Sequence, residues 1–294
     1  MNVLIIGGNK FFGRQLAKRL LEAGTRVTLL NRGKQIDGLG VHQELERLVC
    51  DRTKESQMTE LLKGRTFDAV VDQVCYDAPD ARAACRIFRG KTPLYIFTST
   101  VSVYNGLKKS GFSEEDYQPR GRKFEDVTLA QDYGEGKRQC ETVFFDQGDF
   151  RVIAPRFPIV CGTDDPTGRL LFHVERVRDG RLIQIENVES RMTYISASEA
   201  GAVLHFLLTS GKEGPINVGS RDAISIAGLL DWIGKTVGRM PKVSTTEGDP
   251  SPYGPETDFY PLVTKLESWG FTPSKLEDWL PALIARMNLQ TNAN

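Results

Sequence analysis

Apolar and polar residues form two kinds of segment along this 294-residue chain. Short, nearly continuous apolar runs are typical of strands that are buried on both faces of a parallel sheet. Such runs lie at residues 3–6, 26–30, 48–50, 67–71, 94–97 and 152–154. Between and beyond them, apolar residues recur at the spacing of one helical face. These helical segments are 12–21, 58–62, 80–88, 133–144, 169–179, 201–208, 226–237 and 276–287.

Strand and helix segments alternate through the first hundred residues, which predicts an α/β fold with a doubly wound parallel sheet. Right-handed crossovers would place the carboxyl ends of the strands on one edge, where ligands bind. The alternation stops after Arg156. We therefore predict a first domain of residues 1–160, which also receives roughly residues 193–218, and a smaller second lobe formed mainly by residues 161–294. Within that lobe, residues 238–257 are rich in Pro, Gly, Ser and Thr and predict a flexible lid or an irregular excursion.

A glycine-rich turn separates the first strand from the first helix. It consists of Gly7, Gly8, Asn9, Lys10, Phe11, Phe12 and Gly13. A strand, a tight turn and a helix N-terminus direct backbone N–H groups at a phosphate, so we interpret this turn as the pyrophosphate cradle of a dinucleotide site. The spacing also fits a P-loop, but Arg14-Gln15 stands where Lys followed by Ser or Thr is required. Because the G-x-G-x-x-G fingerprint is absent, an ordinary strand-to-helix turn with glycines for close packing remains an alternative.

The second strand ends about twenty residues beyond the turn, where a dinucleotide-binding fold contacts the adenosine ribose. An acidic residue there would accept from the 2′-hydroxyl and repel a 2′-phosphate. This chain has Asn31, Arg32 and Lys34 instead, with Lys10 and Arg14 nearby on the glycine turn. Fixed positive charges suit a 2′-phosphate, which favours NADP over NAD. A solvated basic surface is the alternative. At the end of the third strand, Asp51 can accept a hydrogen bond from an adenine amino group.

The pattern Tyr-x-x-x-Lys occurs twice, at Tyr133/Lys137 and at Tyr104/Lys108. The second pair spans an Asn-Gly turn, so its side chains need not share a face. The first pair lies in a helical segment, where residues four apart are neighbours, and it follows a strand whose hydroxyl-rich end includes Thr100. A phenol is a poor base at neutral pH, and an ammonium one helical turn away favours its phenolate. We therefore predict that Thr100, Tyr133 and Lys137 serve hydride transfer to or from a nicotinamide; a half-buried aromatic residue beside a solvated lysine is the alternative.

Composition narrows the classes of partner. Lysine plus arginine and aspartate plus glutamate number 38 each, and this zero net charge argues against a non-specific grip on nucleic acid. No run of roughly 18 apolar residues is present, as a membrane span would require, and the first strand begins too early for a signal peptide. The five cysteines are odd in number and lack metal-ligand spacing. We expect a cytoplasmic protein with reduced thiols and no bound metal.

These motifs resemble those of the short-chain dehydrogenase/reductase superfamily, in its extended, NAD-dependent epimerase/dehydratase branch. The glycine turn is similar to G-x-x-G-x-x-G, Asp51 to the adenine-contacting aspartate, and residues 97–104 to a strand that ends in Ser/Thr and Val-Tyr. Tyr133 and Lys137 match the catalytic pair. Further similar segments are Arg156-Phe157-Pro158 with Gly162, Asn217-Val218-Gly219 and Trp269-Gly270-Phe271-Thr272-Pro273. The resemblance implies a Rossmann domain with a small C-terminal substrate lobe.

The resemblance also implies roles for single residues. Tyr133 takes the place of the acid/base residue, Lys137 of its activator and Thr100 of the catalytic Ser/Thr. Arg191 stands near where this branch often binds the phosphate of a nucleotide sugar, and a surface charge is the alternative. The implied substrate is a small molecule such as a sugar nucleotide or another polar alcohol. A homodimer through the helices near residues 80–88 and 130–145 is usual in the branch.

One departure from the branch pattern supports a second function. Lys10 replaces the middle glycine of the turn, and with Asn31-Arg32-Gly33 it looks like an atypical subgroup that contains the chloroplast stem-loop-binding proteins. Those proteins resemble epimerases but are associated with RNA. A basic loop stretch fits the same idea; it comprises Lys108, Lys109, Arg120, Arg122 and Lys123. The alternative function is a nucleotide-dependent binding protein for RNA or another macromolecule with a vestigial dehydrogenase site, although such a stretch is usually only solvated.

Overall fold

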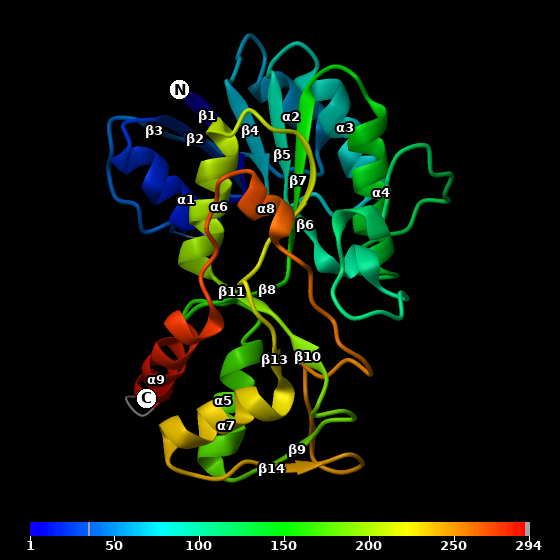
Figure 1. Ribbon diagram of the computed structural model, residues 1–294. Coiled ribbons are helices and arrows are strands. Elements are labelled where there is room, and N and C mark those ends of the chain that lie inside the picture. Colours follow the sequence, from blue (N-terminus) through cyan, green and yellow to red (C-terminus); the bar gives the residue numbers. More distant parts are fainter. Residues whose placement is uncertain (35, 292–294) are drawn as a thin grey trace.

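The computed structural model describes residues 1–34 and 36–291, and Figure 1 shows a sheet-and-helix domain above a smaller lobe. Within this described part, eight strands form one parallel sheet in the order β3-β2-β1-β4-β5-β7-β12, with β6 paired to β7. Their bounds are β1 (Asn2–Ile6), β2 (Arg26–Asn31), β3 (Leu45–Val49), β4 (Ala69–Asp72), β5 (Leu94–Phe97), β6 (Ser99–Thr100), β7 (Arg151–Phe157) and β12 (Gly214–Asn217). The predicted doubly wound sheet is confirmed. Its strand order reverses between β1 and β4, which places a ligand crevice at their carboxyl ends.

Helices cover both faces of the sheet, because successive strand residues point to opposite sides. Val3 and Ile5 share a buried core with α1 (Phe11–Glu22) and α6 (Ala197–Thr209). Leu4 and Ile6 belong to the core on the other face, where the helices are α2 (Glu55–Leu61), α3 (Ala78–Phe88) and α4 (Tyr133–Asp146). This double burial explains the continuous apolar run of β1.

The second lobe has a separate core formed by three helices, α5 (Arg169–Asp179), α7 (Ile226–Val237) and α9 (Leu280–Thr291). Short strands frame it: β8 (Ile159–Cys161) pairs with β11 (Tyr194–Ser196), and β10 (Arg191–Met192) pairs with β13 (Ile224–Ser225). A third small sheet joins β9 (Leu182–Gln184) to β14 (Lys242–Ser244) and β15 (Asp249–Pro250). The chain returns to the large sheet through α6 and β12, and α8 (Thr264–Ser268) lies beside β12.

Two segments differ from the sequence prediction. Residues 238–257 are more than an irregular excursion, because they contain β14 and β15, which pair with β9. The predicted helix at 276–287 is interrupted after a 3-10 turn, η3 (Leu276–Asp278), and α9 begins only beyond Trp279. Pro281 accounts for the new start, since a proline lacks the backbone N–H and is tolerated in the first turn of a helix.

The structure also bears on two expectations from composition. Among the described residues, no helix is both long and apolar enough to cross a membrane. The five cysteines are free thiols, and Cys75 and Cys140 lie 3.8 Å apart between their Sγ atoms in the core beside α4.

Candidate active site

The glycine turn has a backbone that residues with a Cβ rarely adopt. Gly7 has a φ of +95° and Gly8 a φ of +70°, both in the left-handed region. A Cβ atom on Gly8 would lie 2.5 Å from Ile5 Cγ2, and one on Gly13 would lie 2.6 Å from the Gly8 Cα. Lys10 is the N-cap of α1, and its side chain makes no capping hydrogen bond. The first N–H groups of α1 are therefore left for another acceptor, such as a phosphate.

A cavity of about 480 Å³ lies between this turn and the ends of β2 and β3. Seven of the predicted cofactor-binding residues line it: Gly7, Asn9, Lys10, Asn31, Arg32, Lys34 and Asp51. Asn31 Oδ1 accepts a hydrogen bond from the Gly33 backbone N–H over 2.8 Å, so the ribose position carries a neutral amide where NAD-binding folds place a carboxylate. Arg14, in contrast, is ion-paired with Asp164.

Asp51 is held in place by its own turn. Its Oδ1 accepts hydrogen bonds from the backbone N–H and the hydroxyl of Thr53 over 3.0 and 2.9 Å. These two bonds, with the nearby charge of Arg32, lower the pKa of the Asp51 carboxyl. The side chain is therefore an ionised acceptor on the cavity wall, as the predicted contact with an adenine amino group requires.

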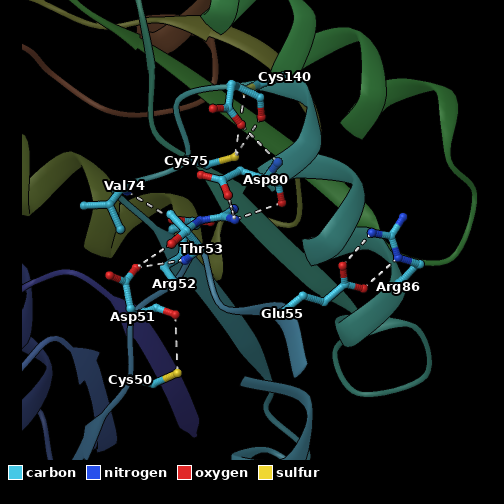
Figure 2. A network of polar contacts seen from close by, with 12 residues as sticks. Cys50, Asp51, Arg52, Thr53, Glu55, Val74, Cys75, Asp80, Arg86 and Cys140 are labelled. Atoms are coloured by element: carbon cyan, nitrogen blue, oxygen red, sulfur yellow. Dashed lines mark hydrogen bonds and ion pairs between the residues drawn. The ribbon is translucent and has the colours of Figure 1, made fainter. Parts of the chain in front are cut away.

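Arg52 lines this cavity and is bonded to two neighbouring segments of the chain (Figure 2). Its Nη2 donates to Asp72 Oδ2 over 2.7 Å, and its Nη1 donates to the Asp80 carbonyl oxygen over 2.9 Å. Asp72 also accepts from the Tyr95 hydroxyl over 2.7 Å and from the Val74 N–H over 3.0 Å. Burial raises the pKa of Asp80 to about 6, although Arg52 opposes the rise. The buried cluster fixes the segments after β3 and β4 against the start of α3.

A second cavity, of about 500 Å³, lies at the ends of β5 and β7 and reaches the second lobe. Thr100, Tyr133 and Lys137 all line it, so the structure brings the three predicted catalytic residues together. Phe11 and Phe12 of the glycine turn line the same cavity. The side chain of Tyr76 lines both cavities, which places them next to each other.

Lys137 is fixed by the ends of two strands. Its buried Nζ donates to the carbonyl oxygens of Cys75 and Thr98 over 2.7 and 2.8 Å. Nζ also lies 4.8 Å from the centre of the Tyr76 ring and 6.0 Å from that of Tyr133. Burial lowers the pKa of Lys137, but the Tyr133 phenol and other acidic groups nearby raise it, and the net shift is upward. The ammonium is therefore retained at neutral pH within reach of the tyrosine ring.

Thr100 is positioned by a buried ion pair behind the cavity. Arg156 on β7 and Glu141 on α4 are both fully buried, and they meet over 2.6 and 3.0 Å. Glu141 Oε1 accepts from the Ser99 hydroxyl over 2.5 Å, and β6, which contains Ser99 and Thr100, pairs with β7 at Arg156 and Phe157. The pair therefore joins α4, which contains Tyr133 and Lys137, to the strand end that contains Thr100.

Three polar atoms in this region are buried without a hydrogen-bond partner, namely Arg52 Nε, Gln73 Nε2 and Thr98 Oγ1. Arg52 lines the first cavity, and Gln73 and Thr98 line the second. Buried polar groups are almost always paired, so such atoms beside a cavity are expected where a polar ligand completes them. The glycine turn and these unpaired atoms fit a nicotinamide dinucleotide that extends from one cavity into the other.

Arg191 is not among the described residues that line the two cavities. Its guanidinium pairs with Asp258 over 2.6 Å and holds the pKa of that carboxyl at about 2. Its Nη2 also donates to Ser110 Oγ over 3.1 Å. The role in phosphate binding stays a prediction, and it would require this ion pair to open.

The second Tyr-x-x-x-Lys pair is not a site of the same kind. Tyr104 is buried in η1 (Val101–Tyr104), and its hydroxyl donates to Asn217 Oδ1 over 2.7 Å, whereas Lys108 is exposed. Three of the five residues in the basic stretch that suggested RNA binding also have partners within the chain. Its contacts are Lys109 with Asp116, Arg122 with Glu135, and Arg120 with the Phe145 carbonyl. These partners weaken the case for an RNA-binding loop.

The sequence analysis did not predict several residues that line the site. Gln73 directly follows β4 and Tyr76 comes shortly after it, and their position at the carboxyl edge of the sheet could have identified them. Arg169 at the start of α5 also lines the second cavity, but it comes from the lobe whose loops contain no motif. Its placement depends on contacts between segments far apart in sequence, which local patterns do not encode.

Comparison with known proteins gives a family match for one part of the chain and a shared fold for the whole of it. Residues 3–84 match the model of the NAD dependent epimerase/dehydratase family, and no curated protein matches the sequence. A putative epimerase from Burkholderia cenocepacia is 17% identical, with 98% of each chain covered and a TM-score of 0.79. A dTDP-glucose 4,6-dehydratase from Bacillus anthracis, solved with NAD, is 13% identical over 100% of this chain and 98% of its own, with a TM-score of 0.79.

A UDP-glucose 4-epimerase from Thermotoga maritima, solved with UDP-glucose, is 16% identical, with both chains fully covered and a TM-score of 0.77. At these identities the likeness shows a shared fold, and it extends over the whole chain. The likeness to chloroplast stem-loop-binding proteins stays a prediction. Residues 3–84 thus match the model of the NAD dependent epimerase/dehydratase family, and the whole chain shares its fold with solved structures of epimerases and dehydratases.

Proposed function

We propose that this protein is an NAD(P)-dependent epimerase, dehydratase or reductase that acts on a polar hydroxyl or carbonyl substrate such as a sugar nucleotide. One observation carries the proposal: Thr100, Tyr133 and Lys137 line a single cavity that adjoins the cavity of the glycine turn. A binding protein has no need for these three residues in one place. The solved structures with NAD and with UDP-glucose support the same class of cofactor and substrate.

Each of the three residues has a separate task. Thr100 holds the substrate oxygen by a hydrogen bond, and Tyr133 takes the proton from that oxygen or returns it. Lys137 keeps its charge beside the tyrosine ring and favours the phenolate form. The nicotinamide, when bound, supplies the acceptor or donor of hydride. The second cavity, which contains these three residues, has aromatic walls formed by Phe11, Phe12 and Tyr76 that limit the access of water.

We further propose that NADP is preferred over NAD. Lys10, Arg32 and Lys34 line the adenosine side of the first cavity, and Asn31 presents no negative charge there. Three fixed cations suit the dianionic 2′-phosphate. The variant Arg32→Ala should weaken NADP⁺ binding about ten- to thirtyfold in isothermal titration and leave NAD⁺ binding within twofold, because only NADP⁺ has the added phosphate. Equal losses for both cofactors would contradict the preference.

The test of the function compares Tyr133→Phe with the parent protein. The variant should bind the dinucleotide normally but lose about 10²- to 10⁴-fold in kcat, because the acid/base hydroxyl is absent. Turnover is followed with NADP⁺ and a panel of nucleoside diphosphate sugars, by absorbance of the reduced cofactor and by chromatographic product analysis. Lys108→Met, in the second Tyr-x-x-x-Lys pair, is the matched control and should retain full activity. A Tyr133→Phe protein as fast as the parent would overturn the assignment.

A further inference from the structure

Gln73 lines the second cavity, beside the glycine turn that borders the first. It is the first residue after β4, and its backbone N–H donates to the Ile6 carbonyl oxygen over 3.0 Å, which fixes it beside the end of β1. Its side chain lies against the glycine turn. A Cβ atom on Gly7 would be 3.4 Å from Gln73 Cβ, and one on Gly13 would be 2.0 Å from Gln73 Oε1. The absence of a side chain at Gly13 therefore makes the space that the carboxamide fills.

The carboxamide is incompletely bonded in the free protein. Gln73 Nε2 is buried and has no hydrogen-bond partner. Such an unpaired group lowers the free energy of unfolding. A leucine would fill a similar volume without that cost. Gln139 on α4 shows the ordinary state of a buried glutamine, because its Nε2 donates to the Glu125 carbonyl over 2.7 Å and its Oε1 accepts from the Val127 N–H over 3.2 Å.

The backbone around Gln73 is rigid. The preceding Asp72 accepts from Arg52 Nη2 and from the Val74 N–H, over 2.7 and 3.0 Å, so the residues on both sides are bonded into the buried cluster in Figure 2. A donor on such a support is preorganised and loses little freedom when it binds a ligand. The pyrophosphate of a dinucleotide offers only hydrogen-bond acceptors, and it is the group that belongs over the glycine turn.

We propose that Gln73 is a cofactor-binding residue whose carboxamide N–H donates to the pyrophosphate of the dinucleotide. This inference rests on the proposed function, because it assumes that a nicotinamide dinucleotide binds at the turn. It adds a side-chain donor to the backbone N–H groups of α1. The unpaired Nε2 gains its partner only in the complex, so the glutamine stabilises the bound form at the expense of the free one.

The experiment measures two quantities separately, the affinity for ligands and the stability of the ligand-free protein. Gln73→Leu should weaken ADP-ribose binding about ten- to a hundredfold in isothermal titration, as expected for a lost hydrogen bond to a charged group. Binding of ADP, which retains the pyrophosphate, should weaken by the same factor. Binding of adenosine, followed by NMR titration, should change less than twofold. The Tm of the ligand-free variant should rise by about 2–5 °C, because an unpaired polar group is removed.

Two further variants make the outcome specific. Gln73→Glu keeps the shape but adds a negative charge, and it should weaken ADP-ribose binding more than Gln73→Leu does. Gln139→Leu removes a fully bonded glutamine, so it should lower the Tm and leave the affinity unchanged. A Gln73→Leu protein that binds ADP-ribose like the parent, or that loses affinity for adenosine equally, would overturn the inference. Failure of the parent protein to bind any dinucleotide would instead refute the proposed function.

Discussion

The buried ion pair between Glu141 and Arg156 leads to a quantitative prediction about the sheet edge. Neither side chain is exposed, and two charge-assisted hydrogen bonds of 2.6 and 3.0 Å join them. Glu141→Gln keeps the shape and removes the negative charge. The Arg156 guanidinium would then remain buried beside a neutral amide, without the carboxylate that offsets its desolvation.

Removal of one partner from a buried pair costs about 3–5 kcal/mol of the free energy of unfolding. Unfolding entropy is about 2.1 cal/mol/K per residue, which for 294 residues amounts to about 0.6 kcal/mol/K. The Tm should therefore fall by about 5–8 °C. A drop in kcat should accompany the loss of stability, because Glu141 also accepts from Ser99, the neighbour of Thr100.

Calorimetry and urea unfolding of Glu141→Gln and the parent would measure the effect. Glu22→Gln is the matched control, since Glu22 faces Lys18 at 3.8 Å on the exposed side of α1. An exposed pair of this kind contributes about 0.5 kcal/mol or less, so the control should shift the Tm by less than about 1 °C. Equal Tm values for Glu141→Gln and Glu22→Gln would refute the claim that the buried pair holds the strand end.

Three further predictions concern the turn, the second lobe and the assembly state. Gly13→Ala should lower both the Tm and the dinucleotide affinity, because its Cβ would lie 2.6 Å from Gly8 Cα, whereas Gly148→Ala meets no atom within 4 Å and should be neutral by calorimetry and titration. Burial lowers the pKa of His173 to about 4, so the unfolded state binds the proton first as the pH falls. The free energy of unfolding from urea titrations should therefore fall by about 3 kcal/mol between pH 6.5 and 4, and His173→Gln should remove this pH dependence. Residues 120–127 pack on α3 and α4, the two helices through which a homodimer of this branch would form, with Asp126 paired to Arg82 at 2.6 Å. We therefore expect a monomer in sedimentation velocity, and a dimer would contradict this.

The fold could be predicted from the sequence where each segment has only one way to be buried. The run at residues 3–6 is apolar at every position, and only a strand covered on both faces satisfies it. The bounds of α5 and α7 follow for a related reason, because each helix ends at a glycine with a positive φ, Gly180 or Gly238. The third strand begins earlier than predicted, at Leu45, because it is an edge strand with exposed polar residues.

The parts of the site that escaped prediction depend on pairing between distant residues. Nothing near Arg191 in the sequence indicates that Asp258 neutralises it, 67 positions later. In the same way, the unpaired amide of Gln73 is visible only once the glycine turn is folded against β4. Glycine turns and helix spacing are local, and they identified residues that line the first cavity, as well as Thr100, Tyr133 and Lys137 in the second. The rest of the second cavity is assembled from several separated segments, and a sequence pattern cannot show which charges remain free there.

The two halves of the site also differ in what supports them. Lys137 is bonded to the carbonyl groups of Cys75 and Thr98, which follow β4 and β5, so the large sheet fixes the ammonium. Part of the wall of the same cavity comes from the second lobe, through Asp165, Pro166, Thr167, Arg169 and Met192. A change in the lobe can therefore alter which substrate fits without moving the ammonium. We infer that substrate selectivity and hydride chemistry are separable in this chain, because no hydrogen bond of Lys137 reaches the lobe within the described residues.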